Sequence, residues 1–132
     1  MGGGTKGVPA LCSAPPVKES AAMPEPEIAI IGSGPAGLVA ALYAARYRRR
    51  TLVVHDNMSR LDLISNTHNV PAFPGGISGP ALLARMAHHA QSAGAEITRG
   101  HVVTARRLAD GFEFTSTDGQ LWRSRVLILA TG

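Results

Sequence analysis

Cysteine is almost absent from this sequence, which contains Cys12 alone among its 132 residues. A disulfide, a redox-active cysteine pair and a cysteine-based zinc site each require at least two cysteines, so none of them can form within this chain. We therefore expect a reducing, cytoplasmic setting.

Long apolar runs are also absent. No stretch approaches the roughly 20 apolar residues that a membrane-spanning helix needs. The first residues lack the charged-then-apolar pattern of a signal peptide. We therefore expect neither membrane insertion nor export.

The basic residues do not form a pattern that suits nucleic acid. The formal net charge of +4 comes largely from a short cluster at the end of a predicted helix, Arg46, Arg48, Arg49 and Arg50. Basic side chains at that place interact favourably with the negative end of the helix dipole. Because neither interleaved aromatic residues nor a known nucleic-acid module accompanies the cluster, we expect no nucleic-acid partner.

The composition that remains is that of a small globular domain, with 45% hydrophobic and 17% charged residues. The length allows at most one ordinary domain. Residues 1–26 contain five of the nine prolines, several glycines and no apolar periodicity, which predicts a disordered tail. We place the folded part at residues 27–132.

Two apolar runs and the segment between them predict a strand–helix–strand unit. Residues 28–31 are a short apolar run bounded by glycine, as in a buried parallel strand. Residues 35–47 are rich in alanine and leucine and begin with a proline at the first helical position, where its missing N–H costs nothing. Residues 51–55 are a second apolar run. The order predicts a right-handed crossover between parallel strands, and hence an α/β fold.

The rest of the chain predicts one more helix and several strands. Residues 56–78 are polar and contain prolines and glycines, which indicates a long loop of the kind that is usually functional. A helix is expected from Pro80 to Gly94, and strands at residues 95–98 and 126–129. Asp-Gly dipeptides separate three short runs that predict an antiparallel meander, at residues 101–107, 112–117 and 120–124.

Residues 32–37 read Gly-Ser-Gly-Pro-Ala-Gly, a G-x-G-x-x-G pattern between a predicted strand and a predicted helix. In that context Gly32 permits the tight turn, Gly34 lets the backbone approach a pyrophosphate, and Gly37 lets helix and strand pack closely. The free N–H groups and the positive end of the helix dipole would then face the phosphates. The alternative is a glycine-rich turn that holds no ligand.

Dinucleotide-binding folds also place an acidic side chain about 20 residues beyond the glycines, where it contacts a ribose. His55 and Asp56 stand there in this chain. A carboxylate accepts two hydroxyl hydrogen bonds and a neutral imidazole accepts one, so we expect Asp56 to be the ribose partner. If His55 held the critical position, ribose binding would be weaker or would use a neutral imidazole.

Three segments together resemble a known family. They are the glycine loop with its Pro35-Ala36, the stretch 59–79 that contains Ser-Arg and Thr-His-Asn-Val-Pro-Ala-Phe-Pro-Gly-Gly-Ile-Ser-Gly, and the closing Leu-Ile-Leu-Ala-Thr-Gly at residues 127–132. The chain resembles the pyridine-nucleotide-disulfide oxidoreductases, and within them the FAD-binding, thioredoxin-reductase-like proteins. This implies a truncated Rossmann-like FAD-binding fold with a central parallel sheet and an antiparallel meander.

The resemblance also implies which residues contact FAD. Those expected to line the pyrophosphate are Gly32, Ser33, Gly34, Pro35 and Ala36. Asn69 is expected on the ribityl and isoalloxazine side, and the backbone of Val102 near the adenine. Thr131 and Gly132 are expected at a turn that passes close to the flavin.

Two features depart from the family pattern. The acid of the second strand is displaced or replaced at His55-Asp56, and Ala72 stands where a glycine is common. Both bear on affinity more than on the fold. No catalytic residue is assigned, and no metal site is expected, since adjacent residues such as His88 and His89 diverge by about 100° on a helix.

The family activity implied by the resemblance is hydride transfer from NAD(P)H to FAD, followed by electron transfer to an acceptor. The acceptor is a disulfide, in a small molecule or a protein, or another group. Complete relatives add a nicotinamide-nucleotide domain and further flavin-site segments, and a homodimer is compatible with the complete enzyme. We expect this chain to be an N-terminal part of such an enzyme and inactive alone. Two alternatives stay open: an NAD(P)-binding domain in which Arg60 meets a 2′-phosphate, and a non-catalytic remnant that acts as a binding module.

Overall fold

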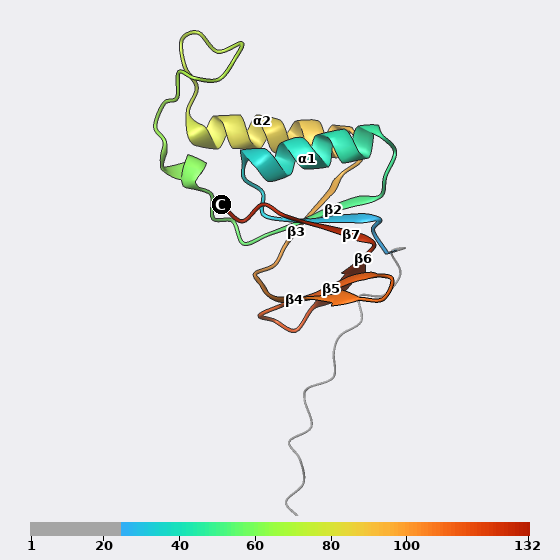
Figure 1. The fold of residues 1–132 in the computed structure, drawn as a ribbon. Helices are drawn as coiled ribbons and strands as arrows, with labels where there is room; N and C mark the ends of the chain where they lie inside the picture. Colours follow the sequence, from blue (N-terminus) through green and yellow to red (C-terminus); the bar gives the residue numbers. More distant parts are fainter. Residues whose placement is uncertain (1–24) are drawn as a thin grey trace, which may run out of the picture.

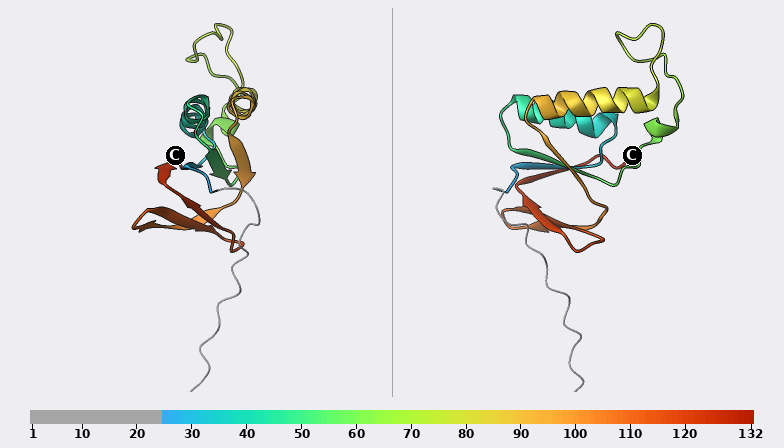
Figure 2. Two further views of the ribbon diagram at one scale, coloured as in Figure 1. Left: turned by 90° about the vertical axis from the view of Figure 1, so that its right-hand side faces the viewer. Right: turned by 180° about the vertical axis from the view of Figure 1, so that it is seen from behind.

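The computed structural model describes residues 25–132, and these residues form three layers (Figure 1). Two helices cover one face of a parallel sheet, and an antiparallel meander covers the other face, an arrangement that two further views show from the end and from behind (Figure 2). Most of the predicted tail, including Cys12, lies outside the described residues.

The parallel sheet has the strand order β3-β2-β1-β7. Its members are β1 (Ile28–Ile31), β2 (Thr51–His55), β3 (Glu96–Arg99) and β7 (Val126–Leu129). The meander has the order β4-β5-β6, with β4 (Val102–Leu108), β5 (Gly111–Ser116) and β6 (Leu121–Ser124). The helices are α1 (Pro35–Arg46), α2 (Gly79–Ser92) and the short 3-10 helix η1 (Arg60–Leu63). The predicted α/β fold is confirmed, and η1 is an addition inside the predicted loop.

The two sides of the parallel sheet bury separate apolar clusters. Successive residues of a strand point to opposite faces, so β1 and β2 contribute to both clusters. The cluster under the meander contains Ala29, Ile31, Leu52, Val54, Phe114 and Trp122. The cluster under the helices contains Ile30, Ala41, Ala45, Val53, Ala90 and Ala95. Burial on both faces explains why these strands are continuous apolar runs in the sequence.

The meander is joined to the parallel sheet through an aromatic pair. The rings of Phe114 and Trp122 are stacked, with centroids 5.5 Å apart. Phe114 is fully buried, and Trp122 is 9% exposed. Large aromatic side chains bury the most apolar area per residue, so this pair accounts for much of the packing between the two sheets.

One face of α1 carries apolar side chains on the surface. Val39, Tyr43 and Tyr47 follow one another at intervals of four residues, and all three are exposed. Val126 and Leu129, on the edge strand β7, are exposed as well. This face of α1 and the edge strand β7 therefore contribute apolar side chains to the surface.

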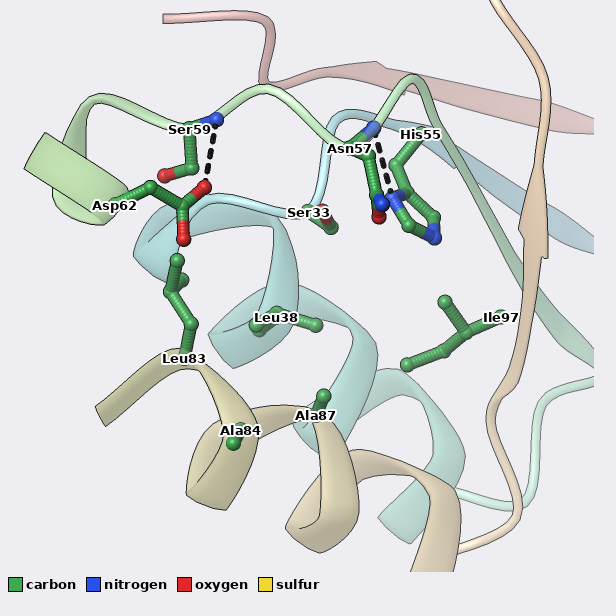
Figure 3. A pocket seen from close by; sticks show the side chains of 10 residues that line it. All are labelled: Ser33, Leu38, His55, Asn57, Ser59, Asp62, Leu83, Ala84, Ala87 and Ile97. Atoms are coloured by element: carbon green, nitrogen blue, oxygen red, sulfur yellow. Dashed lines mark hydrogen bonds between the residues drawn. The ribbon is translucent and has the colours of Figure 1, made fainter. Parts of the chain in front are cut away.

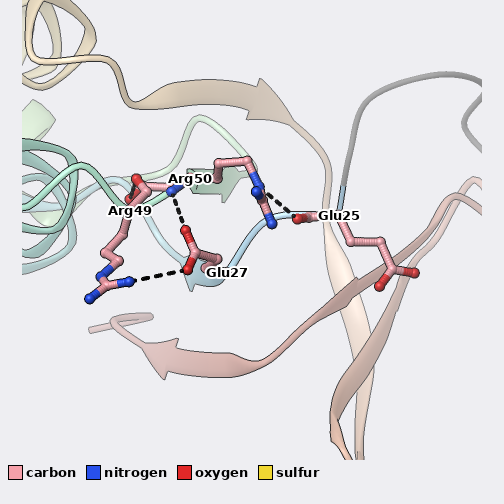
Figure 4. Close-up of polar contacts among 5 residues, drawn as sticks. Glu25, Glu27, Arg49 and Arg50 are labelled. Atoms are coloured by element: carbon pink, nitrogen blue, oxygen red, sulfur yellow. Dashed lines mark hydrogen bonds and ion pairs between the residues drawn. The ribbon is translucent and has the colours of Figure 1, made fainter.

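The arginine cluster does not act as a unit at the end of α1. Arg46 lies in the last helical turn, as the dipole interpretation requires. Arg48 then adopts a left-handed backbone conformation, with φ of 58°, which turns the chain away from the helix axis. Arg49 instead pairs with Glu27 at 3.4 Å, and the backbone N–H of Arg50 donates to the same carboxylate at 3.1 Å (Figure 4). The dipole interpretation is therefore wrong for the last two arginines, which fix the loop before β2 to the start of β1.

On the outer face of the meander, a glutamate lies between two arginines. Glu113 on β5 accepts from Arg106 of β4, whose Nε lies 2.7 Å from Oε1, and from Arg123 of β6, whose Nε lies 2.9 Å from Oε2. The carboxylate is 8% exposed. These hydrogen bonds, from Arg106 first and then Arg123, hold the pKa of Glu113 below its ordinary value.

We expect this carboxylate to make folding stability depend on pH. A folded-state pKa below the unfolded one adds stability that is fully present above the unfolded pKa and is lost as the pH falls through the folded pKa. The loss should begin near the ordinary glutamate pKa of about 4.3. Urea unfolding measures the free energy of unfolding at each pH. Between pH 7 and pH 3 this free energy should fall less for Glu113→Gln than for wild type. If the free energy of unfolding falls equally with pH in the two proteins, Glu113 does not have this role.

Candidate functional site

The glycine loop lies at the carboxyl end of β1, where the chain turns into α1. Gly32 has φ of 110°, a conformation that side chains other than glycine rarely adopt. A Cβ on Gly32 would also collide with the carbonyl oxygen of Ala130, and it would lie 3.2 Å from the backbone nitrogen of Thr131. The loop is therefore packed against the residues that follow β7, and the two segments meet at one edge of the sheet.

The beginning of α1 has no side-chain cap. Gly34 is its N-cap residue, and the first helical hydrogen bond runs from Leu38 N–H to the Gly34 carbonyl at 3.0 Å. In α2, by contrast, the Ser78 hydroxyl accepts from the N–H of Ala81 at 3.3 Å. The first N–H groups of α1 therefore lack a side-chain acceptor, and the positive end of the helix dipole lies beside them.

Open space lies in front of this helix end. The one atom within 4 Å of a Cβ placed on Gly34 is the Ser59 hydroxyl oxygen, at 3.8 Å. Uncapped N–H groups facing open space at a helix N-terminus are a suitable place for a phosphate.

A hollow of about 200 Å³ lies next to the glycine loop (Figure 3). Its polar wall is formed by Ser33, His55, Asn57, Ser59 and Asp62. Its apolar wall is formed by Leu38, Leu83, Ala84, Ala87 and Ile97. Concave sites with an apolar lining and a few polar groups are typical for small ligands. The volume suits a part of a dinucleotide, such as a sugar, rather than the whole molecule.

His55 is the last residue of β2 and faces this hollow. The backbone N–H of Asn57 donates to its Nδ1 at 3.2 Å. Burial lowers the pKa of the His55 imidazole, and the charge of Arg99 lowers it further. The Asp56 carboxylate raises the pKa, but the net pKa stays below the ordinary value. The accepting role of Nδ1 and the direction of the pKa shift both favour the neutral form of the ring.

Asp56 follows β2 and does not belong to the lining of the hollow. One carboxylate oxygen accepts from the N–H of Met58 at 3.1 Å, and the other lies 3.1 Å from Nδ1 of His101. Burial raises the pKa of Asp56, but the hydrogen bonds from Met58 and His101 outweigh it, so that the net pKa lies below the ordinary value. Asp56 links the end of β2 to the segment before β4.

The rim of the hollow at Ser59 is held by a capping box that the sequence analysis missed. The Ser59 hydroxyl accepts from Leu61 N–H at 3.2 Å, and the Asp62 carboxylate accepts from Ser59 N–H at 3.2 Å. The signal was present, because serine followed three residues later by an acidic residue is a common helix-start pattern. Asn57 and Asp62 were not among the expected site residues.

The other expected site residues lie apart from the hollow or at its edge. Arg60 is exposed at the first position of η1. Asn69 accepts a hydrogen bond from the Thr67 hydroxyl and belongs to the segment between η1 and α2 that projects beyond the helices (Figure 1). The Val102 side chain packs against the cluster under the meander, which leaves its backbone for any ligand contact.

Of the expected pyrophosphate residues, Ser33 lines the hollow, and Gly34 and Pro35 form the start of α1. Ala36 is exposed in the first turn of α1. Thr131 and Gly132 lie on the surface after β7, on the side of the glycine loop. The structure thus brings together the glycine loop, the end of β2 and the end of β7.

Two negative findings apply to residues 25–132. None of the helices in this range is long and apolar enough to cross a membrane. Within the same range, no three histidine, cysteine, aspartate or glutamate side chains lie close enough together to hold a metal ion.

Comparison with known proteins gives a consistent family assignment. Residues 26–132 match the family model of the pyridine nucleotide-disulphide oxidoreductases. The chain is 37% identical over 108 residues to the thioredoxin reductase of Aquifex aeolicus, and 38% identical over 108 residues to that of Streptomyces clavuligerus. These matches cover 80% of this chain, but 33% and 34% of the two relatives. The chain therefore spans about a third of the length of these relatives.

Solved structures give the same result. A thioredoxin reductase from Gloeobacter violaceus superimposes with a TM-score of 0.78 at 30% identity, over 82% of this chain and 37% of that one. The thioredoxin reductase of Lactococcus lactis superimposes with a TM-score of 0.77 at 30% identity, over 82% of this chain and 36% of that one. The resemblance inferred from the three sequence segments is confirmed.

Proposed function

The chain belongs to the pyridine nucleotide-disulphide oxidoreductase family, as a thioredoxin-reductase-like domain, and from this membership we propose that it binds FAD through the ADP half of the cofactor. The single observation that carries the proposal is the uncapped start of α1 behind Gly34, where a Cβ would have no neighbour closer than the Ser59 hydroxyl at 3.8 Å. Backbone can approach a pyrophosphate closely at such a place.

The residues around this point fit the cofactor. The pyrophosphate would lie against Gly34, Pro35 and Ala36, next to the positive end of the helix dipole. The adenosine ribose would extend from Ser33 toward the end of β2 and the hollow. Thr131 and Gly132 would line the far side of the glycine loop, and the backbone of Val102 the adenine side.

We propose the activity of the whole protein at the level of the family. FAD, when bound, supplies the hydride and electron chemistry between NAD(P)H and a disulfide or another acceptor. The residues of this chain contribute binding and orientation, and none of them is assigned a proton transfer. Asn69 would come near the ribityl side only if its projecting segment bends toward the glycine loop. The low cysteine content agrees with a cytoplasmic setting.

A flavin titration tests the binding proposal. Purified protein mixed with FAD should retain a yellow flavin spectrum after gel filtration, and the flavin signal should change saturably on titration. Because the proposed contacts are made with the ADP half, ADP should displace FAD, while riboflavin at the same concentration should not. Displacement by riboflavin but not by ADP would contradict the proposal.

We expect no NAD(P)H-dependent turnover from the 132-residue chain supplied with FAD and a disulfide substrate. Hydride transfer needs the nicotinamide within about 3–3.5 Å of the flavin. Among residues 25–132, one G-x-G-x-x-G segment lies between a strand and a helix, and Cys12 has no second cysteine to form a redox pair. The absorbance of NADPH at 340 nm measures the rate. Turnover well above that of free FAD would show that the chain holds a nicotinamide site of its own.

A further inference from the structure

The end of β2 places His55, and not Asp56, on the helix side of the sheet. Leu52 and Val54 pack under the meander, whereas Val53 packs under the helices. The alternation of side chains along a strand therefore directs His55 to the helix side, where it lines the hollow together with Ser33 (Figure 3).

The hydrogen bond to Nδ1 determines where the His55 proton lies. A neutral imidazole has one N–H donor and one acceptor nitrogen. Asn57 N–H donates to Nδ1 at 3.2 Å, so Nδ1 is the acceptor and Nε2 carries the hydrogen. Among residues 25–132, no group forms a hydrogen bond with Nε2. The His55 ring, which lines the hollow, therefore has an N–H donor without a partner among these residues.

We infer that His55, rather than Asp56, faces the adenosine ribose and donates a hydrogen bond from Nε2, so that this end of the site tolerates a phosphate on the ribose 2′ oxygen. The inference rests on the FAD-binding function proposed above. It replaces the sequence-based expectation for Asp56. A carboxylate at the end of the second strand accepts from the ribose 2′ hydroxyl and repels a phosphate there. An N–H donor accepts no hydrogen bond from the 2′ hydroxyl and does not repel a phosphate on the 2′ oxygen.

The charged groups around His55 agree with this specificity. Arg99 is the register partner of His55 on β3, and its charge acts on the imidazole. Two carboxylates, those of Asp56 and Asp62, belong to the same region, and each already accepts hydrogen bonds from other groups. Asp56 is paired with Met58 N–H and His101, and Asp62 accepts from Ser59 N–H. The residues that α2 contributes to the hollow are apolar, Leu83, Ala84 and Ala87. No unpaired carboxylate among the lining residues faces the imidazole.

The position of the proton can be measured without a ligand. Long-range ¹H–¹⁵N NMR of the imidazole nitrogens in the full chain at pH 7.5 should show His55 as the neutral Nε2–H form, identified by the loss of its signals in His55→Gln. An Nδ1–H form or an imidazolium would overturn the inference. This readout does not depend on the folding of any charged variant.

Ligand preference is measured by calorimetric titration with ADP and with 2′-phospho-ADP (adenosine 2′-phosphate 5′-diphosphate), which keeps the 5′ pyrophosphate and differs from ADP only at the ribose 2′ oxygen. Wild type should bind the two ligands with dissociation constants within about threefold of each other. His55→Glu restores a carboxylate and should favour ADP by at least about tenfold, because like charges then face each other. Asp56→Asn serves as the matched control and should keep the wild-type preference.

Two outcomes would overturn the inference and leave the proposed function intact. One is a wild type that binds ADP but binds 2′-phospho-ADP at least tenfold more weakly. The other is loss of ADP binding in Asp56→Asn together with wild-type affinity in His55→Ala. A different outcome concerns the proposed function. If wild type binds neither ligand while its NMR spectrum shows a folded chain with the Nε2–H form, dinucleotide binding itself is wrong.

Discussion

Replacing Gly34 with valine should weaken FAD binding by at least about 100-fold, or roughly 2.7 kcal/mol, while the chain stays folded. Gly34 has φ of −67° and ψ of 176°, which any residue can adopt. A Cβ would have room against the protein, since its one near neighbour is the Ser59 hydroxyl at 3.8 Å. The added side chain would instead occupy the space in front of the α1 N–H groups, where the pyrophosphate is proposed to lie.

Fluorescence titration of FAD measures the affinity, and far-UV circular dichroism checks the fold. Gly75→Val is the matched control, because a Cβ on Gly75 meets no atom within 4 Å and the residue lies outside the hollow. That variant should bind FAD like wild type. A folded Gly34→Val protein with unchanged affinity would mean that the glycine loop does not hold a pyrophosphate.

The sequence predicts the α/β framework because its strands are buried on both faces. Residues 28–31 and 51–55 are continuous apolar runs, and the structure has strands at both places. The alanine-rich segment between them forms α1, and two Asp-Gly dipeptides mark the turns of the meander. Each of these signals is local, so it does not depend on how distant parts of the chain pack.

The choice between His55 and Asp56 could not be made from composition and spacing. A shift of one residue in a strand reverses the face to which a side chain points, and the spacing rule of about 20 residues has no such resolution. The register of β2 against β1 and β3, together with the hydrogen bond from Asn57, is what directs His55 to the hollow. The sequence-based expectation of Asp56 as the ribose partner rested only on the number of hydrogen bonds that a carboxylate can accept.

The positions of Arg49 and Asn69 depend on contacts that sequence spacing does not reveal. Arg49 follows a helix and therefore suggested a dipole interaction, but the left-handed backbone at Arg48 turns it toward Glu27, 22 residues earlier. Asn69 lies in a long segment without regular structure, whose direction is set by the capping box of η1 and by the Thr67–Ile77 bridge. Loops of this length have no pattern that predicts their orientation.

A Gly37→Ala substitution should lower the free energy of unfolding by at least about 2–3 kcal/mol. Helix propensity alone predicts the opposite sign, since alanine is favoured over glycine by about 1 kcal/mol inside a helix. The Cβ would collide with the carbonyl oxygen of Gly32 and would lie 3.3 Å from the Cβ of Ala130. Gly37 is buried, and the first obstacle is backbone in a tight turn, so the contact cannot be relieved by rotating a side chain.

Urea unfolding followed by circular dichroism gives the free energies for wild type, Gly37→Ala and Gly34→Ala. The last variant adds the same methyl group three residues earlier, where it meets open space, and should lower stability by no more than about 1 kcal/mol, the cost of alanine in place of glycine at a helix N-cap. A Gly37→Ala protein as stable as wild type, or more stable, would mean that α1 does not approach the glycine turn as closely as described. The two variants thus separate the two functions of one motif, because Gly37 allows the helix to pack on the turn and Gly34 leaves the space that a phosphate needs.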